Sequence, residues 1–86
     1  MGNARLLVVE DDVDIANMLK IYFTSLQYDV DVANRGRDAL EKTKHVLPHL
    51  IVLDIMLPDI DGYEVCRNLR TSTRTSHIPV IFLTQK

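Results

Sequence analysis

The chain has 86 residues, of which 47% are hydrophobic and 26% are charged. Because a chain of this length can bury only one modest core, we expect a single domain spanning residues 1–86. The formal net charge of -2 provides no basic footprint for nucleic acid, and no apolar run reaches the roughly 18 residues of a membrane span. A lone cysteine, Cys66, excludes an internal disulfide. No signal-peptide pattern occurs at residues 1–4, so we expect a cytoplasmic protein.

The first half of the chain alternates between strand-like and helix-like patterns. Residues 5–9 are an aliphatic run that stops at Glu10, and apolar residues at helical spacing follow. The positions expected on one face of this helix are Ile15, Met18, Leu19, Tyr22, Phe23 and Leu26. Asp12 and Asp14 suit its N-terminus, where carboxylates cap backbone amides. Residues 28–33 alternate apolar with acidic side chains, which predicts a strand with one wet side at a sheet edge.

The second half repeats this alternation. Residues 37–46 predict a second helix after a turn that contains glycine. Residues 50–53 form a continuous apolar run, which is typical of a central strand buried on both faces of a parallel sheet. Residues 62–70 predict a third helix, and residues 78–83 predict a fourth strand with Pro79 tolerated near its start. Strands and helices therefore alternate along the whole chain.

Such alternation predicts an α/β fold with an open parallel sheet and right-handed crossovers. With the second strand at an edge and the third in the centre, the strand order 2-1-3-4 fits best. In this order the first and third strands are neighbours whose connections leave in opposite directions, and open α/β sheets place their sites at such a point. The carboxyl ends that meet there carry Glu10, Asp11 and Asp54.

Three carboxylates in one crevice repel each other unless a proton or a cation is taken up. Mg²⁺ suits such a site, because it accepts one or two carboxylates and leaves positions for water and phosphate oxygens. A carboxylate beside this ion can attack phosphorus and form an acyl phosphate. Thr84, at the end of the strand beside Asp54, offers a hydroxyl to the same group. Together these residues predict a site that accepts a phosphoryl group.

Three segments carry a resemblance to a known family: Leu-Val-Val-Glu-Asp-Asp at 7–12, the run 50–65 that includes Leu-Asp-Ile-Met-Leu-Pro-Asp-Ile-Asp-Gly, and Ile-Pro-Val-Ile-Phe-Leu-Thr at 78–84. In content, order and spacing they resemble the receiver domain of bacterial two-component response regulators. The resemblance implies the flavodoxin-like receiver topology and a soluble signalling domain that is not an enzyme. It covers the whole chain.

The resemblance also implies roles for individual residues. Asp54 is similar to the phosphoacceptor, which takes its phosphoryl group from a histidine on a sensor histidine kinase or a phosphotransfer protein. Asp11 is expected to bind Mg²⁺ directly and Glu10 through water. Met56 stands where the family supplies a backbone carbonyl to the metal, and Thr84 where it supplies the hydroxyl that responds to phosphorylation.

One departure from the family concerns the end of the chain. A complete receiver continues past the threonine through a helix, a fifth strand and a closing helix, so we expect residues 1–86 to be a receiver truncated after the fourth strand. The fifth strand supplies a lysine and an aromatic residue, and Lys86 follows Thr84 too closely to be that lysine. We expect exposed apolar surface on the third and fourth strands and an open edge on the fourth. These features predict self-association as a homodimer or larger assembly.

Two other function classes remain open. The first is an interaction module that keeps the receiver fold and self-associates without phosphorylation. The second is an aspartate-nucleophile phosphohydrolase of the haloacid dehalogenase type, which requires a second aspartate two positions after the nucleophile. Met56 occupies that position and disfavours this reading.

Overall fold

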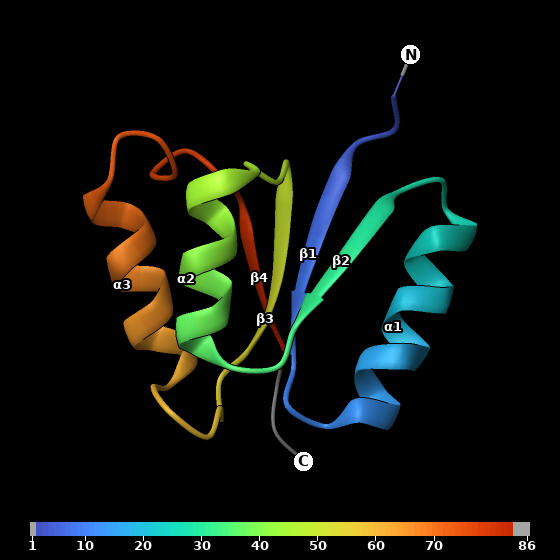
Figure 1. The fold of residues 1–86 in the computed structure, drawn as a ribbon, viewed down its shortest axis with the longest axis horizontal. Helices are drawn as coiled ribbons and strands as arrows, with labels where there is room; N and C mark the ends of the chain where they lie inside the picture. Colours follow the sequence, from blue (N-terminus) through green and yellow to red (C-terminus); the bar gives the residue numbers. More distant parts are fainter. Residues whose placement is uncertain (1, 84–86) are drawn as a thin grey trace.

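A computed structural model describes residues 2–83, which alternate between strands and helices (Figure 1). The elements are β1 Arg5–Val9, α1 Val13–Ser25, β2 Asp29–Ala33, α2 Gly36–His45, β3 Leu50–Asp54, α3 Gly62–Thr71 and β4 Val80–Leu83. This order confirms the predicted one, although β4 begins at Val80 and not at Ile78. The N–H of Ile78 closes a turn onto the Thr75 carbonyl at 3.1 Å, and Pro79 has no N–H for the sheet. Across residues 2–83, no helix combines the length and the apolar character that membrane crossing requires.

The strands form one parallel sheet in the order β2-β1-β3-β4, which confirms the predicted α/β fold and strand order. β1 and β3 are central neighbours, with Val9 paired to Leu53 at their carboxyl ends. Asp54 pairs with Leu83 of β4 one step further along. Because all strands run in the same direction, the residues that follow β1 and end β3 meet at one edge of the sheet.

The helices cover the two faces of the sheet unequally. Figure 1 shows α1 on one side of the sheet and α2 and α3 together on the other. The core under α2 and α3 consists of Leu7, Val9, Ala33, Ala39, Ile51, Leu53, Val65, Leu69 and Ile78. The core under α1 is smaller and consists of Leu6, Val8 and Val52. This arrangement explains the continuous apolar pattern of β3, because its side chains enter both cores.

The apolar face of α1 is wider than the surface that the helix covers. Leu19 and Phe23 pack against the sheet as predicted, and Ala16 is buried with them. Met18 and Tyr22, predicted on the same face, are 62% and 57% exposed. The apolar residues predicted on one face are therefore only partly buried, because α1 contacts the sheet along a narrower stripe than these residues span.

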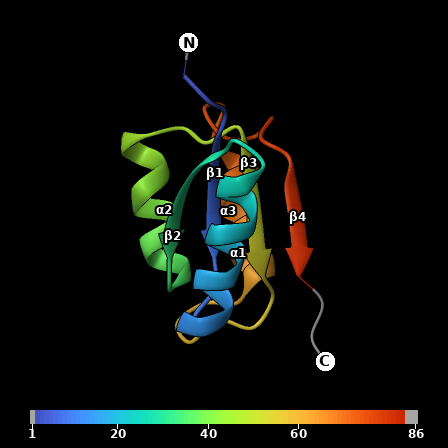
Figure 2. The same ribbon diagram turned by 90° about the vertical axis from the view of Figure 1, so that its right-hand side faces the viewer.

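The two edges of the sheet differ in character. Figure 2 shows β4 alone at one edge, and within residues 2–83 no strand pairs with its outer side. Ile81 on β4 pairs in register with Val52 and therefore lies on the α1 face, where it is 51% exposed. Val52 itself is buried, so the predicted exposure of apolar surface is confirmed for the fourth strand and wrong for the third. On β2, at the other edge, Asp29 and Asp31 are exposed.

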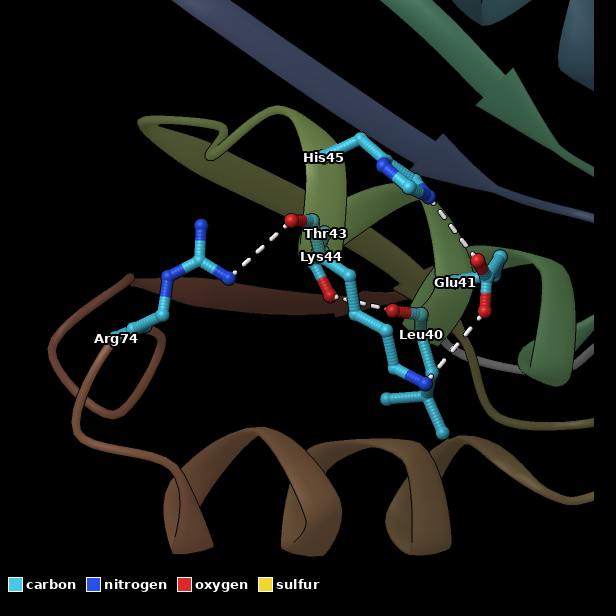
Figure 3. Close-up of polar contacts among 6 residues, drawn as sticks. All are labelled: Leu40, Glu41, Thr43, Lys44, His45 and Arg74. Carbon is cyan, nitrogen blue, oxygen red and sulfur yellow. Dashed lines mark hydrogen bonds and ion pairs between the residues drawn. The ribbon is translucent and has the colours of Figure 1, made fainter.

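The end of α2 is held by the connection between α3 and β4. Figure 3 shows the Arg74 guanidinium directed at the Lys44 carbonyl, to which Nη1 donates at 3.2 Å. On the same turn of α2, the Glu41 carboxylate lies 3.0 Å from His45 Nε2 and 3.5 Å from Lys44 Nζ. Arg74 therefore occupies a carbonyl that the helix leaves without an internal partner, and it joins the ends of α2 and α3 opposite the acidic edge.

Candidate functional site

Glu10 follows β1 directly and is buried, with 4% of its surface exposed. Its N–H donates to the Ala33 carbonyl at 3.0 Å, which extends the pairing of β1 with β2 by one residue. Its carboxylate accepts from the Asp12 N–H at 3.1 Å, and its carbonyl accepts from Asn34 Nδ2 at 2.9 Å. Residues 33 and 34 thus hold the backbone of Glu10, and Asp12 in its own loop holds the carboxylate.

Asp54 is the last residue of β3 and is also 4% exposed. The Met56 N–H donates to Asp54 Oδ1 at 3.3 Å, so the start of the following loop folds back over the carboxylate. The loop closes where the Gly62 N–H donates to the Ile55 carbonyl at 2.7 Å. Asp54 therefore lies at the end of a strand that is buried on both faces, and the backbone of the following loop contacts its carboxylate.

Glu10, Asp11 and Asp54 come together as the sequence predicts. Each offers a carboxylate oxygen, and these oxygens lie within 4.8 Å of one another. Glu10 and Asp54 are buried and Asp11 is exposed, so the cluster opens toward solvent at Asp11. A compact set of carboxylate oxygens with one open side matches the preference of a hard divalent cation such as Mg²⁺.

The electrostatics of the site favour the uptake of positive charge. Burial, together with the negative charge of Asp54, raises the pKa of the Glu10 carboxyl to about 7, although the hydrogen bond from the Asp12 N–H lowers it. An acid with this pKa is partly protonated at neutral pH. A cation would replace that proton, so the donor set fits Mg²⁺ chemically.

The remaining predicted site residues divide into three groups. Asp12 is the N-cap of α1, accepting from the N–H groups of Asp14 and Ile15 at 2.9 and 3.1 Å, and Asp14 lies in the first turn, as predicted. The Met56 side chain is 63% exposed, and the backbone of this residue contacts the site through its N–H, which donates to Asp54. Thr84 lies outside the described residues.

Sequence reasoning missed two contacts beside the site. Asn34 donates to the Glu10 carbonyl, and Asp59 accepts from the N–H groups of Gly36 and Arg37 at the start of α2. The sequence contains one signal for the Asp59 contact, because arginine, which precedes α2 at position 35, is not a capping residue type. In the structure Arg35 makes no side-chain cap bond. A helix that begins this way needs a partner from elsewhere in the chain.

Residues 6–86 match the family described as the response regulator receiver domain. The chain is 44% identical over 81 residues to the transcriptional regulatory protein AfsQ1 of Streptomyces coelicolor, covering 94% of this chain and 35% of that protein. The chain therefore spans about a third of the length of this curated relative.

Solved structures show the same likeness. A response regulator from Chloroflexus aurantiacus superimposes with a TM-score of 0.90 at 34% identity, covering 93% of this chain and 66% of that one. The receiver domain of the sensor histidine kinase PA1611 from Pseudomonas aeruginosa, described with a magnesium ion in its active site cleft, gives 0.92 at 28% identity, covering 96% and 68%. With the family match across nearly its whole length, this chain belongs to the response regulator receiver domain family.

Proposed function

We propose that this receiver domain accepts a phosphoryl group on Asp54 from a phosphohistidine on a sensor histidine kinase or a phosphotransfer protein. The observation that carries the proposal is the convergence of Glu10, Asp11 and Asp54, whose carboxylate oxygens lie within 4.8 Å of one another. Family membership supports the phosphoacceptor role. The domain then acts as a regulatory element in the cytoplasm and not as an enzyme with a separate substrate.

The chain's own residues would have distinct roles in this transfer. An Asp54 oxygen forms the new O–P bond while the N–P bond to the donor histidine breaks, and the imidazole nitrogen keeps the electron pair of that bond. Glu10, Asp11, Asp54 and the Met56 carbonyl would hold Mg²⁺, with Thr84 contacting the phosphoryl group. The chemistry that the ion supplies when bound is neutralisation of charge on the transferred group.

Phosphorylation by acetyl phosphate with Mg²⁺, read out by intact mass, tests the proposal. The wild-type chain should gain one phosphoryl group and Asp54→Asn none. Asp29→Asn is the matched control, because Asp29 is exposed at the opposite end of the sheet and should leave the gain intact. A wild-type chain that gains no phosphoryl group from acetyl phosphate with Mg²⁺ would contradict the phosphoacceptor role.

A second candidate function, self-association without phosphorylation, is favoured by the β4 edge. This edge has no charged side chain among Val80–Leu83, and Ile81 is 51% exposed. Uncharged edges are prone to pair with another strand. We infer that two copies of the 86-residue chain pair at this edge and cover the open surface beside α1.

Sedimentation velocity at micromolar concentration tests the inferred dimer. The wild-type chain and Asp54→Asn should both sediment as dimers, and Ile81→Lys as a monomer. Ile21→Lys is the control, since Ile21 is 72% exposed and belongs to α1 and not to the β4 edge. A monomeric wild-type chain would refute self-association while leaving phosphorylation untouched.

A further inference from the structure

The start of α2 is capped by a residue from a distant part of the chain. Arg35 precedes the helix and makes no side-chain cap bond. Instead, Asp59 in the loop between β3 and α3 accepts from the Gly36 N–H at 2.9 Å and from the Arg37 N–H at 2.8 Å. The carboxylate thereby satisfies two of the backbone donors that a helix start leaves open. The same two bonds tie the loop after the phosphoacceptor to α2.

Asp59 makes these bonds as a carboxylate. Burial alone would raise its pKa, but the N–H groups of Arg37, Ile60 and Gly36 lower it to about 2. The Arg37 guanidinium adds an ion pair at 4.0 Å between Nε and Oδ2, with the Asp59 side chain 16% exposed. The negative charge also lies at the positive end of the α2 dipole. Both oxygens are therefore engaged at the helix start.

Packing reinforces the same contact. A Cβ atom added to Gly36 would lie 2.6 Å from Ile60 Cγ1 and 2.7 Å from Val65 Cγ2. Such distances are shorter than carbon contacts allow, so only glycine lets the helix start approach the loop and α3 this closely. The loop is thus held against α2 through the Asp59 carboxylate and the neighbouring Ile60 side chain.

The two bonds of Asp59 act on the loop that follows Asp54 and carries Met56. The loop begins after Asp54, includes Met56, and is closed at its base by the 2.7 Å bond from the Gly62 N–H to the Ile55 carbonyl. Asp59 fixes its far side. Two positions before Gly36, Asn34 donates to the Glu10 carbonyl on the other acidic loop. Residues 34–37 therefore contact both the β1–α1 loop, which carries Glu10 and Asp11, and the loop that follows Asp54.

We propose that Asp59 is a positioning residue for the acidic site. By holding the β3–α3 loop on the start of α2, it sets the Met56 backbone relative to Asp54 and aligns that loop with Glu10. The inference rests on the proposed metal-dependent phosphoacceptor role and adds to it a residue that touches neither metal nor phosphate. Partners that orient metal ligands from outside the coordination shell commonly change metal affinity by ten- to a hundredfold, as an order of magnitude.

The test compares Asp59→Ala with Asp61→Ala. Asp61 lies on the same loop and caps α3 locally, accepting from the Glu64 N–H at 2.9 Å, so its loss removes a cap of the same type without the tether. Mg²⁺ affinity is measured by NMR titration of the full chain, and loop order by amide exchange at Met56 and Gly62 without metal. Asp59→Ala should weaken Mg²⁺ binding roughly tenfold and speed exchange at both amides. Asp61→Ala should leave Mg²⁺ affinity unchanged, because it does not release the loop from α2.

Asp59→Asn keeps one acceptor oxygen and should recover part of both effects, which also guards against a folding defect in the alanine variant. Equal Mg²⁺ affinity and equal exchange in wild type and Asp59→Ala would overturn the positioning role. A wild-type chain that bound no Mg²⁺ would instead contradict the proposed function. The two failures are therefore distinguishable.

Discussion

Two acidic loops leave the central strands at the same edge of the sheet, yet they are built differently. The β1–α1 loop, residues 10–12, is short and consists entirely of acidic residues. The β3–α3 loop, residues 55–61, is longer and carries a base closure at Gly62 and a tether at Asp59. Each ends in an aspartate that caps the following helix. The β1–α1 loop therefore contributes mainly negative charge to the site, and the β3–α3 loop contributes mainly contacts that fix the backbone.

The difference indicates how the two halves of the site should respond to change. The β1–α1 loop places Glu10 in a buried, negatively charged setting, so its contribution depends on pH and on cations. The β3–α3 loop is closed by a backbone bond at its base and contacts α2 through the Asp59 and Ile60 side chains, so its contribution depends on shape. In the β3–α3 loop, a substitution that leaves the charge unchanged should be tolerated only where the new side chain fits without overlapping neighbouring atoms.

Gly62→Ala should have the largest effect and would show how strongly shape governs the β3–α3 loop. A Cβ at this position would overlap the Asp54 carbonyl oxygen and lie 2.9 Å from Ile55 Cα, and both are backbone atoms that cannot rotate away. We expect a loss of about 3 kcal/mol or more in the free energy of unfolding, measured by urea denaturation.

Gly2→Ala is the matched control for this substitution, because a Cβ there meets no atom within 4 Å. It should leave stability unchanged. A loss below about 1 kcal/mol for Gly62→Ala would mean that the loop can shift, and the contrast between the two loops would weaken.

Glu10→Gln tests the role of charge in the β1–α1 loop. The pKa of Glu10 is about 7 in the folded chain against an ordinary 4.5, so the folded state holds a proton that the unfolded state has lost. Its stabilising contribution is complete below about pH 4.5 and is lost as pH rises through 7. The metal-free wild type should therefore lose on the order of 2 kcal/mol between pH 5 and pH 8 relative to the variant.

Urea denaturation at both pH values in the presence of a chelator measures this difference. Glutamine has nearly the same shape and stays neutral, so the comparison isolates the ionisation. If both chains showed the same pH dependence, the buried charge would not govern this loop.

Asp12→Ala and Asp61→Ala should have the smallest effects and compare the two caps directly. Asp12 accepts from two N–H groups and Asp61 from one. Each substitution should cost about 1 kcal/mol of unfolding free energy, with the larger loss at Asp12. Thermal unfolding of both variants gives the ranking, and the reverse order would show that the number of cap bonds does not set the cost.

The sequence was sufficient to predict the fold and the acidic cluster. The alternating pattern of residues 28–33 and the continuous run of residues 50–53 place the edge and central strands, and strand order then brings Glu10 and Asp54 together. These predictions succeed because the spacing of apolar residues and the polarity of each segment can be read from neighbouring positions in the chain.

The contacts that sequence reasoning missed are not local. Asp59 caps Gly36 from 23 positions away, and nothing in the residues around Asp59 marks it as a cap for another helix. The partial exposure of Met18 and Tyr22 was missed for a related reason. Helical periodicity shows which residues share a face, and only the packed structure shows how much of that face the sheet covers.

The bond from Arg74 to the Lys44 carbonyl has a consequence for how the chain is made. Residues 36–45 form a helix that is too short to persist by itself in water, and both of its ends are held by residues synthesised later, Asp59 and Arg74. On the ribosome, α2 should therefore remain unformed as it emerges. We expect it to become a stable helix once the residues that hold its two ends have left the exit tunnel, so the acidic edge should acquire its final geometry late in synthesis.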